Sequence, residues 1–195
     1  MAEVKLLIPG YAVKRVNGWT ASPNTTLITD RGKKVLVDPG SHHEILEKLE
    51  LLSVWPEEID VVFLTHYHLD HTLNTSQFKD AVVMDQRWMY DDDMITEHEG
   101  VIPGTGIDIL KTPGHTLECS SLLVDTTRGT VAVCGDLFWF QKDKMVGLER
   151  DTLIRMKDEL AVDQELLEKS RRVVLDRARK IIPGHGSPFV VERDQ

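Results

Sequence analysis

The sequence predicts an α/β domain, because strand-like runs, turns and amphipathic helical segments follow one another along the chain. Asp30-Arg31-Gly32 and Thr126-Thr127-Arg128-Gly129 each lie between two runs of apolar and β-branched residues, so hairpins are expected at both places. Segments that begin near Ser41 and Asp163 carry apolar residues at the spacing of an α-helix. Strands and helices are therefore interleaved.

The expected strands are short apolar runs bounded by turn residues. Asp38-Pro39-Gly40, for example, ends one of them, because proline and glycine at these positions interrupt a strand. In chain order the expected strands are Val4–Ile8, Thr25–Thr29, Lys34–Val37, Val61–Leu64, Ala81–Met84, Ile107–Leu110, Ser120–Val124 and Thr130–Val133.

The first expected helix follows Ser41. Ser41 and Glu44 have the spacing of a capping box, and a helix of about three turns then places its apolar residues on one face. Those residues are Ile45, Leu46, Leu49 and Leu52. A second helix is expected to begin after Asp70-His71.

The last expected helix is capped by Asp163 and ends before Ile181-Ile182. Its residues at helical spacing are Leu166, Leu167, Ser170, Val173, Val174 and Arg177, so one face is expected to pack on the core. The basic residues gathered here are interpreted as a solvated helix face rather than a phosphate track. They are Lys169, Arg171, Arg172, Arg177, Arg179 and Lys180.

Composition indicates one soluble domain over residues 1–195. Hydrophobic residues make up 41% and charged residues 28% of the chain, which is ordinary for a globular domain. The net charge of −9 is the wrong sign for a protein that grips long nucleic acids through their phosphates. No signal peptide or membrane span is expected, so the predicted location is the cytoplasm and no membrane partner is expected. Cys119 and Cys134 are interpreted as small buried hydrophobes, with a disulfide as the less favoured alternative.

Metal-competent side chains cluster directly after the expected strand Val61–Leu64. His66, His68, Asp70 and His71 follow one another within six positions, and packing alone does not explain such polar density after an apolar strand. Strand ends are also where ligands collect in α/β proteins. The segment is therefore a candidate metal site.

Three further candidates follow other expected strands, each next to a glycine that permits a tight turn. They are His115, Asp136 and His185. Five imidazoles and two carboxylates are enough for two divalent ions if one carboxylate bridges them. Zinc is the preferred metal for such a set, with manganese and iron as alternatives.

These motifs resemble those of the metallo-β-lactamase superfamily. The resemblance rests on Thr65–His71, followed in order by Thr112–His115, Cys134–Phe138 and Ile182–Gly186, and it extends from about Pro23 to His185. It implies a four-layer αββα sandwich of two mixed β-sheets, with helices on the outer faces and metals at one edge. Substrate is not implied, because one scaffold of this kind hosts several hydrolytic reactions.

Carried over residue by residue, the resemblance implies two metal sites that share one carboxylate. His66, His68 and His115 would bind the first metal, Asp70, His71 and His185 the second, and Asp136 would bridge them. Asp38 matches a strand-end aspartate of the family and is expected to support a ligand histidine from behind.

The implied activity is hydrolysis by a metal-bridging hydroxide, which Asp70 would orient. The segment Leu167–Val173, together with Ile182–Phe189 and Asp70–Asn74, also resembles an animal branch of the superfamily to which RNA endonuclease activity has been assigned, so a phosphodiesterase is one expectation. A thioesterase like glyoxalase II or another acyl hydrolase is the alternative. Two further classes are kept open: a single-iron persulfide dioxygenase and a binding module with structural metals.

Two positions at which the chain differs from other branches of the superfamily restrict the branch to which it is expected to belong. Diiron, oxygen-reducing relatives have glutamate where His68 stands, and secreted lactamases often have cysteine where Asp136 stands. Both residues favour a hydrolase outside those branches. The expected substrate is a small ester or thioester or a short RNA, without long duplex nucleic acid, and a homodimer is a further expectation.

Two weaker candidates lie outside the ligand set. His98, in the polar interval Asp91–Gly104, is a candidate proton donor to the leaving group, although an exposed loop histidine is the preferred interpretation. That interval is expected to be a surface loop that either is simply solvated or overhangs the site. Trp139 follows Asp136 closely and is a candidate pocket residue, whereas Trp19, Trp55 and Trp88 are expected to fill the core.

Overall fold

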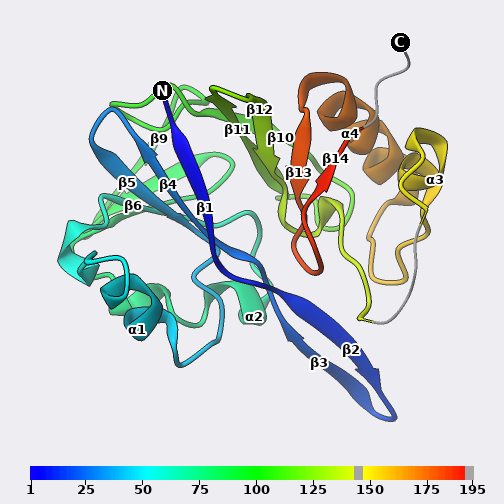
Figure 1. The fold of residues 1–195 in the computed structure, drawn as a ribbon, viewed down its shortest axis with the longest axis horizontal. Coiled ribbons are helices and arrows are strands. Elements are labelled where there is room, and N and C mark those ends of the chain that lie inside the picture. Colours follow the sequence, from blue (N-terminus) through cyan, green and yellow to red (C-terminus); the bar gives the residue numbers. More distant parts are fainter. Residues whose placement is uncertain (143–146, 192–195) are drawn as a thin grey trace.

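Two β-sheets face each other across the centre of the molecule (Figure 1). The computed structural model describes residues 1–142 and 147–191. The larger sheet has the strand order β1 (Glu3–Ile8), β4 (Thr25–Asp30), β5 (Lys33–Val37), β6 (Val61–Phe63), β7 (Val82–Met84), β8 (Trp88–Asp91), β9 (Met94–Glu97). The smaller sheet has the order β10 (Asp108–Lys111), β11 (Ser120–Thr126), β12 (Gly129–Val133), β13 (Lys180–Ile182), β14 (Phe189–Val190).

Both sheets are mixed, and their parallel strands end at the same edge. In the larger sheet β5, β6 and β7 are parallel neighbours, and in the smaller sheet β12 and β13 are parallel. Strand β10 has the direction of β12, because both pair antiparallel with β11. The segments that follow β5, β6, β10, β12 and β13 therefore reach one edge of the sandwich, where ligands bind in folds of this kind.

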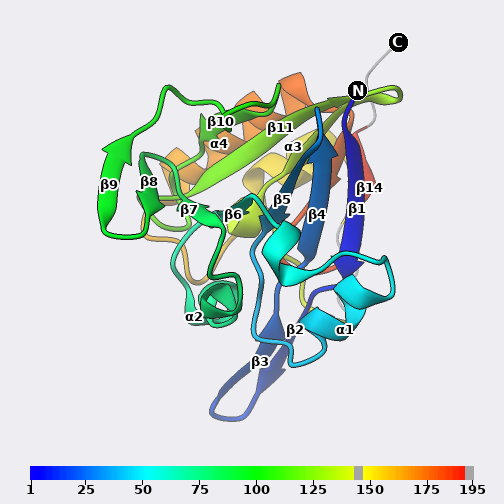
Figure 2. The ribbon, with the colours of Figure 1, turned by 90° about the vertical axis from the view of Figure 1, so that its left-hand side faces the viewer.

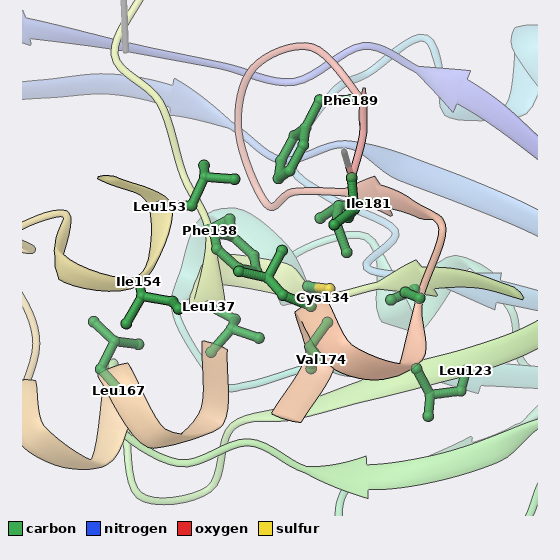
Figure 3. Close-up of a cluster of buried hydrophobic side chains, with 14 residues drawn as sticks. Leu123, Cys134, Leu137, Phe138, Leu153, Ile154, Leu167, Val174, Ile181 and Phe189 are labelled. Atoms are coloured by element: carbon green, nitrogen blue, oxygen red, sulfur yellow. The ribbon is translucent and has the colours of Figure 1, made fainter. Parts of the chain in front are cut away.

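Three hydrophobic clusters define the layers. The central one joins the inner faces of the sheets, with Val37 and Phe63 on one side and Val124 and Val133 on the other. On the outer face of the larger sheet, α1 (Ile45–Glu50) buries Ile45 and Leu49. On the outer face of the smaller sheet, α3 (Arg150–Arg155) and α4 (Gln164–Arg177) pack over Leu137, Phe138 and Ile181 (Figure 3). The predicted four-layer αββα sandwich is confirmed.

A separate hairpin of β2 (Tyr11–Arg15) and β3 (Gly18–Ser22) extends away from the sandwich in both views (Figures 1 and 2). The remaining helical elements are short: α2 (Leu69–Thr72), η1 (Pro56–Glu58), η2 (Thr75–Gln77) and η3 (Gly135–Leu137). Within residues 1–142 and 147–191, no helix has the length and apolarity needed to cross a membrane.

The predicted strands are confirmed, with shifted ends, but the interval Asp91–Gly104 is not the surface loop that was expected. It contains β9, which forms an edge hairpin with β8. Asp92 makes the turn in the left-handed region, at φ 55°, a conformation that aspartate tolerates better than most residues. The polar composition of the segment therefore reflects an exposed sheet edge. Strands β2, β3, β8 and β14 and helix α3 were also missed.

Helix starts differ from the sequence prediction in two places. Glu44, not Ser41, occupies the N-cap position of α1, no side-chain cap bond forms, and the helix ends at Glu50, so the predicted capping box is wrong. Helix α2 begins at Leu69, which puts Asp70 and His71 inside it rather than before it. The start of α4 is as predicted, since Asp163 accepts a hydrogen bond from the Leu166 amide at 2.9 Å.

Candidate metal centre

All seven predicted ligands lie together at the edge where the parallel strands end. His66 and His68 follow β6, Asp70 and His71 lie in α2, His115 follows β10, Asp136 lies in η3 after β12, and His185 follows β13. Their ligand atoms form two groups, each within 4.8 Å: His66, His68, His115 and Asp136, and then Asp70, His71 and His185. The resemblance implies the same division of the other six residues, with Asp136 shared between the two groups.

Asp136 stands between the two groups, and each of its oxygens faces one of them. Oδ2 lies 3.3 Å from His115 Nε2 and 3.9 Å from His66 Nε2. Oδ1 lies 3.4 Å from Nε2 of both His71 and His185. A carboxylate in this position can contribute one oxygen to each of two cations.

The donor atoms fit divalent cations. His115 Nε2 lies 3.1 Å from His68 Nδ1, and His71 Nε2 lies 3.4 Å from His185 Nε2. Where both nitrogens of a pair are deprotonated, their lone pairs repel at these distances, and a cation between them turns the repulsion into attraction. His66 Nε2 and Asp136 Oδ1 are buried without a hydrogen-bond partner in the described chain, which is costly unless another group binds them. The cluster therefore has the chemistry of a site for divalent metal ions.

Acceptors behind two of the rings fix which nitrogen faces the centre. Asp38 Oδ2 accepts from His71 Nδ1 at 2.8 Å. The Thr65 hydroxyl accepts from His66 Nδ1 at 3.1 Å and donates to Asp38 at 2.8 Å. A proton held on Nδ1 leaves Nε2 as a lone-pair donor, so Asp38 supports one histidine of each group.

Asp158 performs the same task for His115, and sequence reasoning missed it. Its Oδ2 accepts from His115 Nδ1 at 2.7 Å, and the carboxylate is buried. Asp158 lies in the segment between α3 and α4, 43 residues from its partner, and no motif surrounds it. Only the fold brings the two together.

The chain holds His185 in a different way. Its Nδ1 donates to the main-chain oxygens of Ser22, at 2.8 Å, and Tyr11, at 3.1 Å, both in the projecting hairpin. Asn24, just after that hairpin, donates its amide to the carbonyls of Pro183 and Gly186 at 2.8 Å each. The N-terminal hairpin region therefore positions the last ligand, and Asn24 was not recognised in the sequence either.

Backbone conformation at the centre depends on a few positions. Asp38 adopts φ 47°, a left-handed conformation that costs an aspartate on the order of 1 kcal/mol, which the surrounding hydrogen bonds offset. Gly184 is required for another reason: a Cβ there would overlap Asp136 Oδ1 and the Gly135 backbone. The close approach of the His185 loop to η3 therefore depends on glycine.

Burial and neighbouring charges set the protonation of the ligands. Burial lowers the pKa of His66 well below its ordinary value, so this ring is neutral near pH 7 and can donate its lone pair. Burial opposes ionisation of Asp136, but His185 and His71 beside it hold the pKa of its carboxyl well below the ordinary value. A neutral imidazole and an ionised carboxylate are the forms that bind metals.

A cavity of about 280 Å³ opens onto both groups. Its lining combines candidate ligands with apolar side chains: Ala12, Trp19, Ala21, His68, Asp70, Asp136, Trp139, Leu160 and His185. The rings of Trp19 and Trp139 meet edge to face with their centroids 5.4 Å apart. Among residues 1–142 and 147–191, no lysine or arginine is part of this lining. The nearby Lys14 lies over the Trp19 ring and pairs with Glu159 at 2.8 Å.

The tryptophan predictions are therefore partly wrong. Trp139 lines the cavity as expected, but so does Trp19, which was expected in the core. Trp55 is 53% exposed, and Trp88 is half-buried beneath the Arg87 guanidinium. The expectation failed because burial of an indole depends on which face of its strand or turn packs, and these positions lie in elements that the sequence did not reveal.

His98 lies on the β8–β9 side, away from the residues that line the cavity. The Gly100 amide donates to its Nδ1 at 3.0 Å, so its Nε2 donates to the Asp85 carbonyl at 2.9 Å. Both ring nitrogens are thus used in holding the turn. His98 is therefore half-buried rather than the exposed loop histidine that was expected, and its hydrogen bonds favour a structural role over that of a proton donor.

Comparison with known proteins agrees with these observations. The family model of the metallo-beta-lactamase superfamily matches residues 19–105. Metallo-beta-lactamase domain-containing protein 1 of Xenopus laevis is 36% identical, over 97% of the chain and 82% of the frog protein. The protein of the same name in Mus musculus is 31% identical over 82% of the chain, and the match spans 62% of the mouse protein, less than two thirds of its length.

Solved structures share the fold at low sequence identity. A candidate metallo-beta-lactamase of Thermotoga maritima superposes with a TM-score of 0.72 at 20% identity, covering 97% of the chain and 99% of that protein. AidC, described as a dizinc quorum-quenching lactonase, gives a TM-score of 0.60 at 14% identity over 88% of the chain and 75% of its own. At these identities the likeness concerns the fold alone.

The frog relative covers nearly the whole chain, and the segments that carry the candidate ligands meet at one edge of an αββα sandwich. The chain belongs to the metallo-beta-lactamase superfamily of metal-dependent hydrolases.

Proposed function

We propose that the chain is a two-metal hydrolase that cleaves an ester, thioester or lactone bond in a small substrate without a phosphate backbone. The observation that carries the two-metal part is the position of Asp136, one oxygen of which faces each ligand group. The chemistry of the cavity supports the acyl part. The proposal thus follows the acyl alternative rather than the phosphodiesterase.

Three imidazole nitrogens would hold the first ion: His66 Nε2, His68 Nδ1 and His115 Nε2. Asp70, His71 and His185 would hold the second, with Asp136 shared between the ions. Imidazole and carboxylate without thiolate suit zinc, and manganese or iron as alternatives. When bound, two such ions would supply Lewis acidity and would lower the pKa of water between them toward neutrality.

Residues of the chain complete the reaction site. The side chain of Asp70 is 29% exposed and lines the cavity, so its carboxylate can accept a hydrogen bond from the attacking water and orient it. Trp19, Trp139 and Leu160 line the cavity with apolar surface, against which an apolar part of an acyl substrate can pack. A leaving thiolate needs little proton donation, whereas the alkoxide released from a lactone or alkyl ester can take the proton that Asp70 accepts from the attacking water.

The cavity favours an acyl substrate over RNA. Proteins grip a phosphodiester chain with lysine and arginine, whereas the described lining has neither and the whole chain carries a net charge of −9. A volume of about 280 Å³ also suits a small acyl group, since pockets for drug-sized ligands begin at roughly 300 Å³.

The test compares hydrolysis rates of the zinc-loaded protein on four substrates: a neutral lactone, an aryl ester, a glutathione thioester and single-stranded RNA. Chelator-sensitive hydrolysis of the lactone or ester with silent RNA is the expected result. Chelator-sensitive cleavage of RNA with silent acyl substrates would overturn the acyl proposal in favour of the phosphodiesterase. A second sample, purified without added metal, is analysed for iron and assayed on a persulfide, and one iron per chain with oxygen-dependent turnover would overturn hydrolysis itself.

The proposed location is the cytoplasm. Both cysteines, Cys119 and Cys134, are free and buried, and burial raises the pKa of each thiol to about 12. Free thiols without a disulfide are usual in a reducing compartment.

A further inference from the structure

Among the basic residues on and after α4, Arg171 differs most from the sequence prediction. A solvated helix face was expected, and the neighbours Lys169 and Arg172 are indeed exposed. The side chain of Arg171 is instead fully buried, between α4, η3 and the end of α3. A buried guanidinium is expensive, so its contacts require an explanation.

The guanidinium binds main-chain carbonyls of two separate segments. Its Nε donates to the Leu137 carbonyl at 2.8 Å, and its Nη1 donates to the carbonyls of Ile154, at 3.3 Å, and Met156. The plane lies over the Phe138 ring, 5.6 Å from its centroid. One side chain therefore ties η3 to the C-terminal end of α3.

Both segments carry residues of the candidate metal centre. Leu137 is the residue after Asp136, which stands between the two ligand groups. Met156 lies two residues before Asp158, whose carboxylate supports His115 Nδ1. The guanidinium thus lies between the segment that carries Asp136 and the segment that supports His115, and Asp136 Oδ2 lies 3.3 Å from His115 Nε2.

Packing alone does not account for an arginine here. In the described chain Arg171 forms no ion pair within 4.0 Å and its Nη2 has no hydrogen-bond partner, while burial lowers its pKa to about 10. Replacing a buried charge with an apolar side chain of similar volume is often neutral or stabilising. What arginine adds over an apolar side chain is a rigid, planar fork of N–H donors, which can hold two backbone segments at a fixed separation.

We propose that Arg171 is a positioning residue of the metal centre. It holds the Asp136 segment and the Asp158 segment at a fixed separation, so that Asp136 and His115 can bind the same metal ion. This inference rests on the proposed two-metal function. It assigns no contact of Arg171 with substrate or metal. Its effect is exerted through η3 and the segment after α3.

The test loads Co²⁺ in place of zinc into Arg171→Met and records the visible absorption spectrum, the metal affinity and the rate of hydrolysis. The expected result is an altered Co²⁺ spectrum, about 10- to 100-fold weaker binding at the first site and a comparable fall in kcat, the range seen when groups behind metal ligands are removed. Arg171→Lys retains the charge but not the fork, so an intermediate spectrum and rate are expected.

Two controls separate positioning from stability. Arg172→Met removes a charge from the exposed side of the same helix and should leave spectrum and rate unchanged. Val174→Ala truncates a fully buried side chain of α4 and should lower Tm without changing the spectrum. If Arg171→Met merely lowers Tm, with the spectrum and kcat of Val174→Ala, the positioning role is wrong.

Two further outcomes keep the inference testable. If Arg171→Met does not fold, the Co²⁺ spectrum of Arg171→Lys decides, and a spectrum equal to that of the parent protein would overturn the role of the fork. If the parent protein binds two Co²⁺ ions but hydrolyses no substrate, the proposed function fails, while the spectra and affinities of the variants still test Arg171.

Discussion

The two ligand groups of the metal centre are supported by different parts of the molecule. In the first group, the rings of His66 and His115 are held from behind by side chains, Thr65 and Asp158. In the second group, His71 is held by the Asp38 side chain, but His185 is held by main-chain carbonyls of the β2–β3 hairpin. Asp136 and Asp38 serve both groups, whereas Asp158 serves the first alone.

This difference determines which ligand group loses its support when one residue is substituted. A side-chain support is removed by one mutation, while a carbonyl support persists unless the backbone moves. The first group is therefore open to single-residue tests that leave the second intact, and residues shared by both groups should have the largest effects. Four substitutions, taken in order of decreasing expected effect, test this difference.

Asp136→Ala should have the largest effect, because it removes a carboxylate whose two oxygens each face one of the groups. We expect fewer than two metal ions per chain and a fall in kcat of about a thousandfold, or about 4 kcal/mol of transition-state free energy. Metal analysis by mass spectrometry and steady-state kinetics measure the two effects. Two tightly bound ions in this variant would contradict the shared position of Asp136.

Asp38→Ala should weaken both groups indirectly. It removes the acceptor of His71 Nδ1 and both hydrogen bonds to Thr65, whose hydroxyl holds His66. Metal affinity should fall about 10- to 100-fold at both sites. Unfolding free energy should fall by about 2 to 3 kcal/mol, because buried donors lose their partner. Calorimetric titration with zinc and thermal denaturation check this, and weakening of one site alone would contradict it.

Asp158→Ala should affect the first group selectively. His115 loses the acceptor that holds its Nδ1 proton, while no described contact of the second group changes. The expected result is about 10- to 100-fold weaker binding of one ion, with the affinity for the other unchanged. Competition titrations with a chromophoric chelator resolve the two affinities. An equal loss at both sites would show that the groups are not supported independently.

His98→Ala should have the smallest effect. Its ring nitrogens bind the Asp85 carbonyl and the Gly100 amide, and it does not line the cavity. We expect kcat within about twofold of the parent value and a loss of stability of about 1 kcal/mol from the two hydrogen bonds. A fall in kcat that is larger for substrates with poor leaving groups would instead restore His98 as the proton donor.

Local sequence patterns determined most of the fold. The hairpin turn at Asp30-Arg31-Gly32 forms with Arg31 at φ 49° and Gly32 at φ 83°, the backbone that a two-residue hairpin loop needs. Asp163 caps α4 as its spacing indicates. Such features depend on neighbours a few residues away, so the sequence contains all the information required. The edge hairpin β8–β9 escaped because the acidic run Asp91–Asp93 at its turn was interpreted as part of a polar loop and because the outer strand β9 is largely exposed.

The candidate ligands were also identifiable from the sequence alone. Four of them lie within one six-residue motif, His66–His71, and the other three each follow a glycine at a strand end. Their supports were not identifiable in this way. Asp158 reaches His115 across 43 residues, the Tyr11 carbonyl reaches His185 across 174, and Arg171 lies in a helix whose sequence indicates a solvated charge. Which side chain stands behind a ligand depends on how separate layers pack, and packing of distant segments is decided by the tertiary structure.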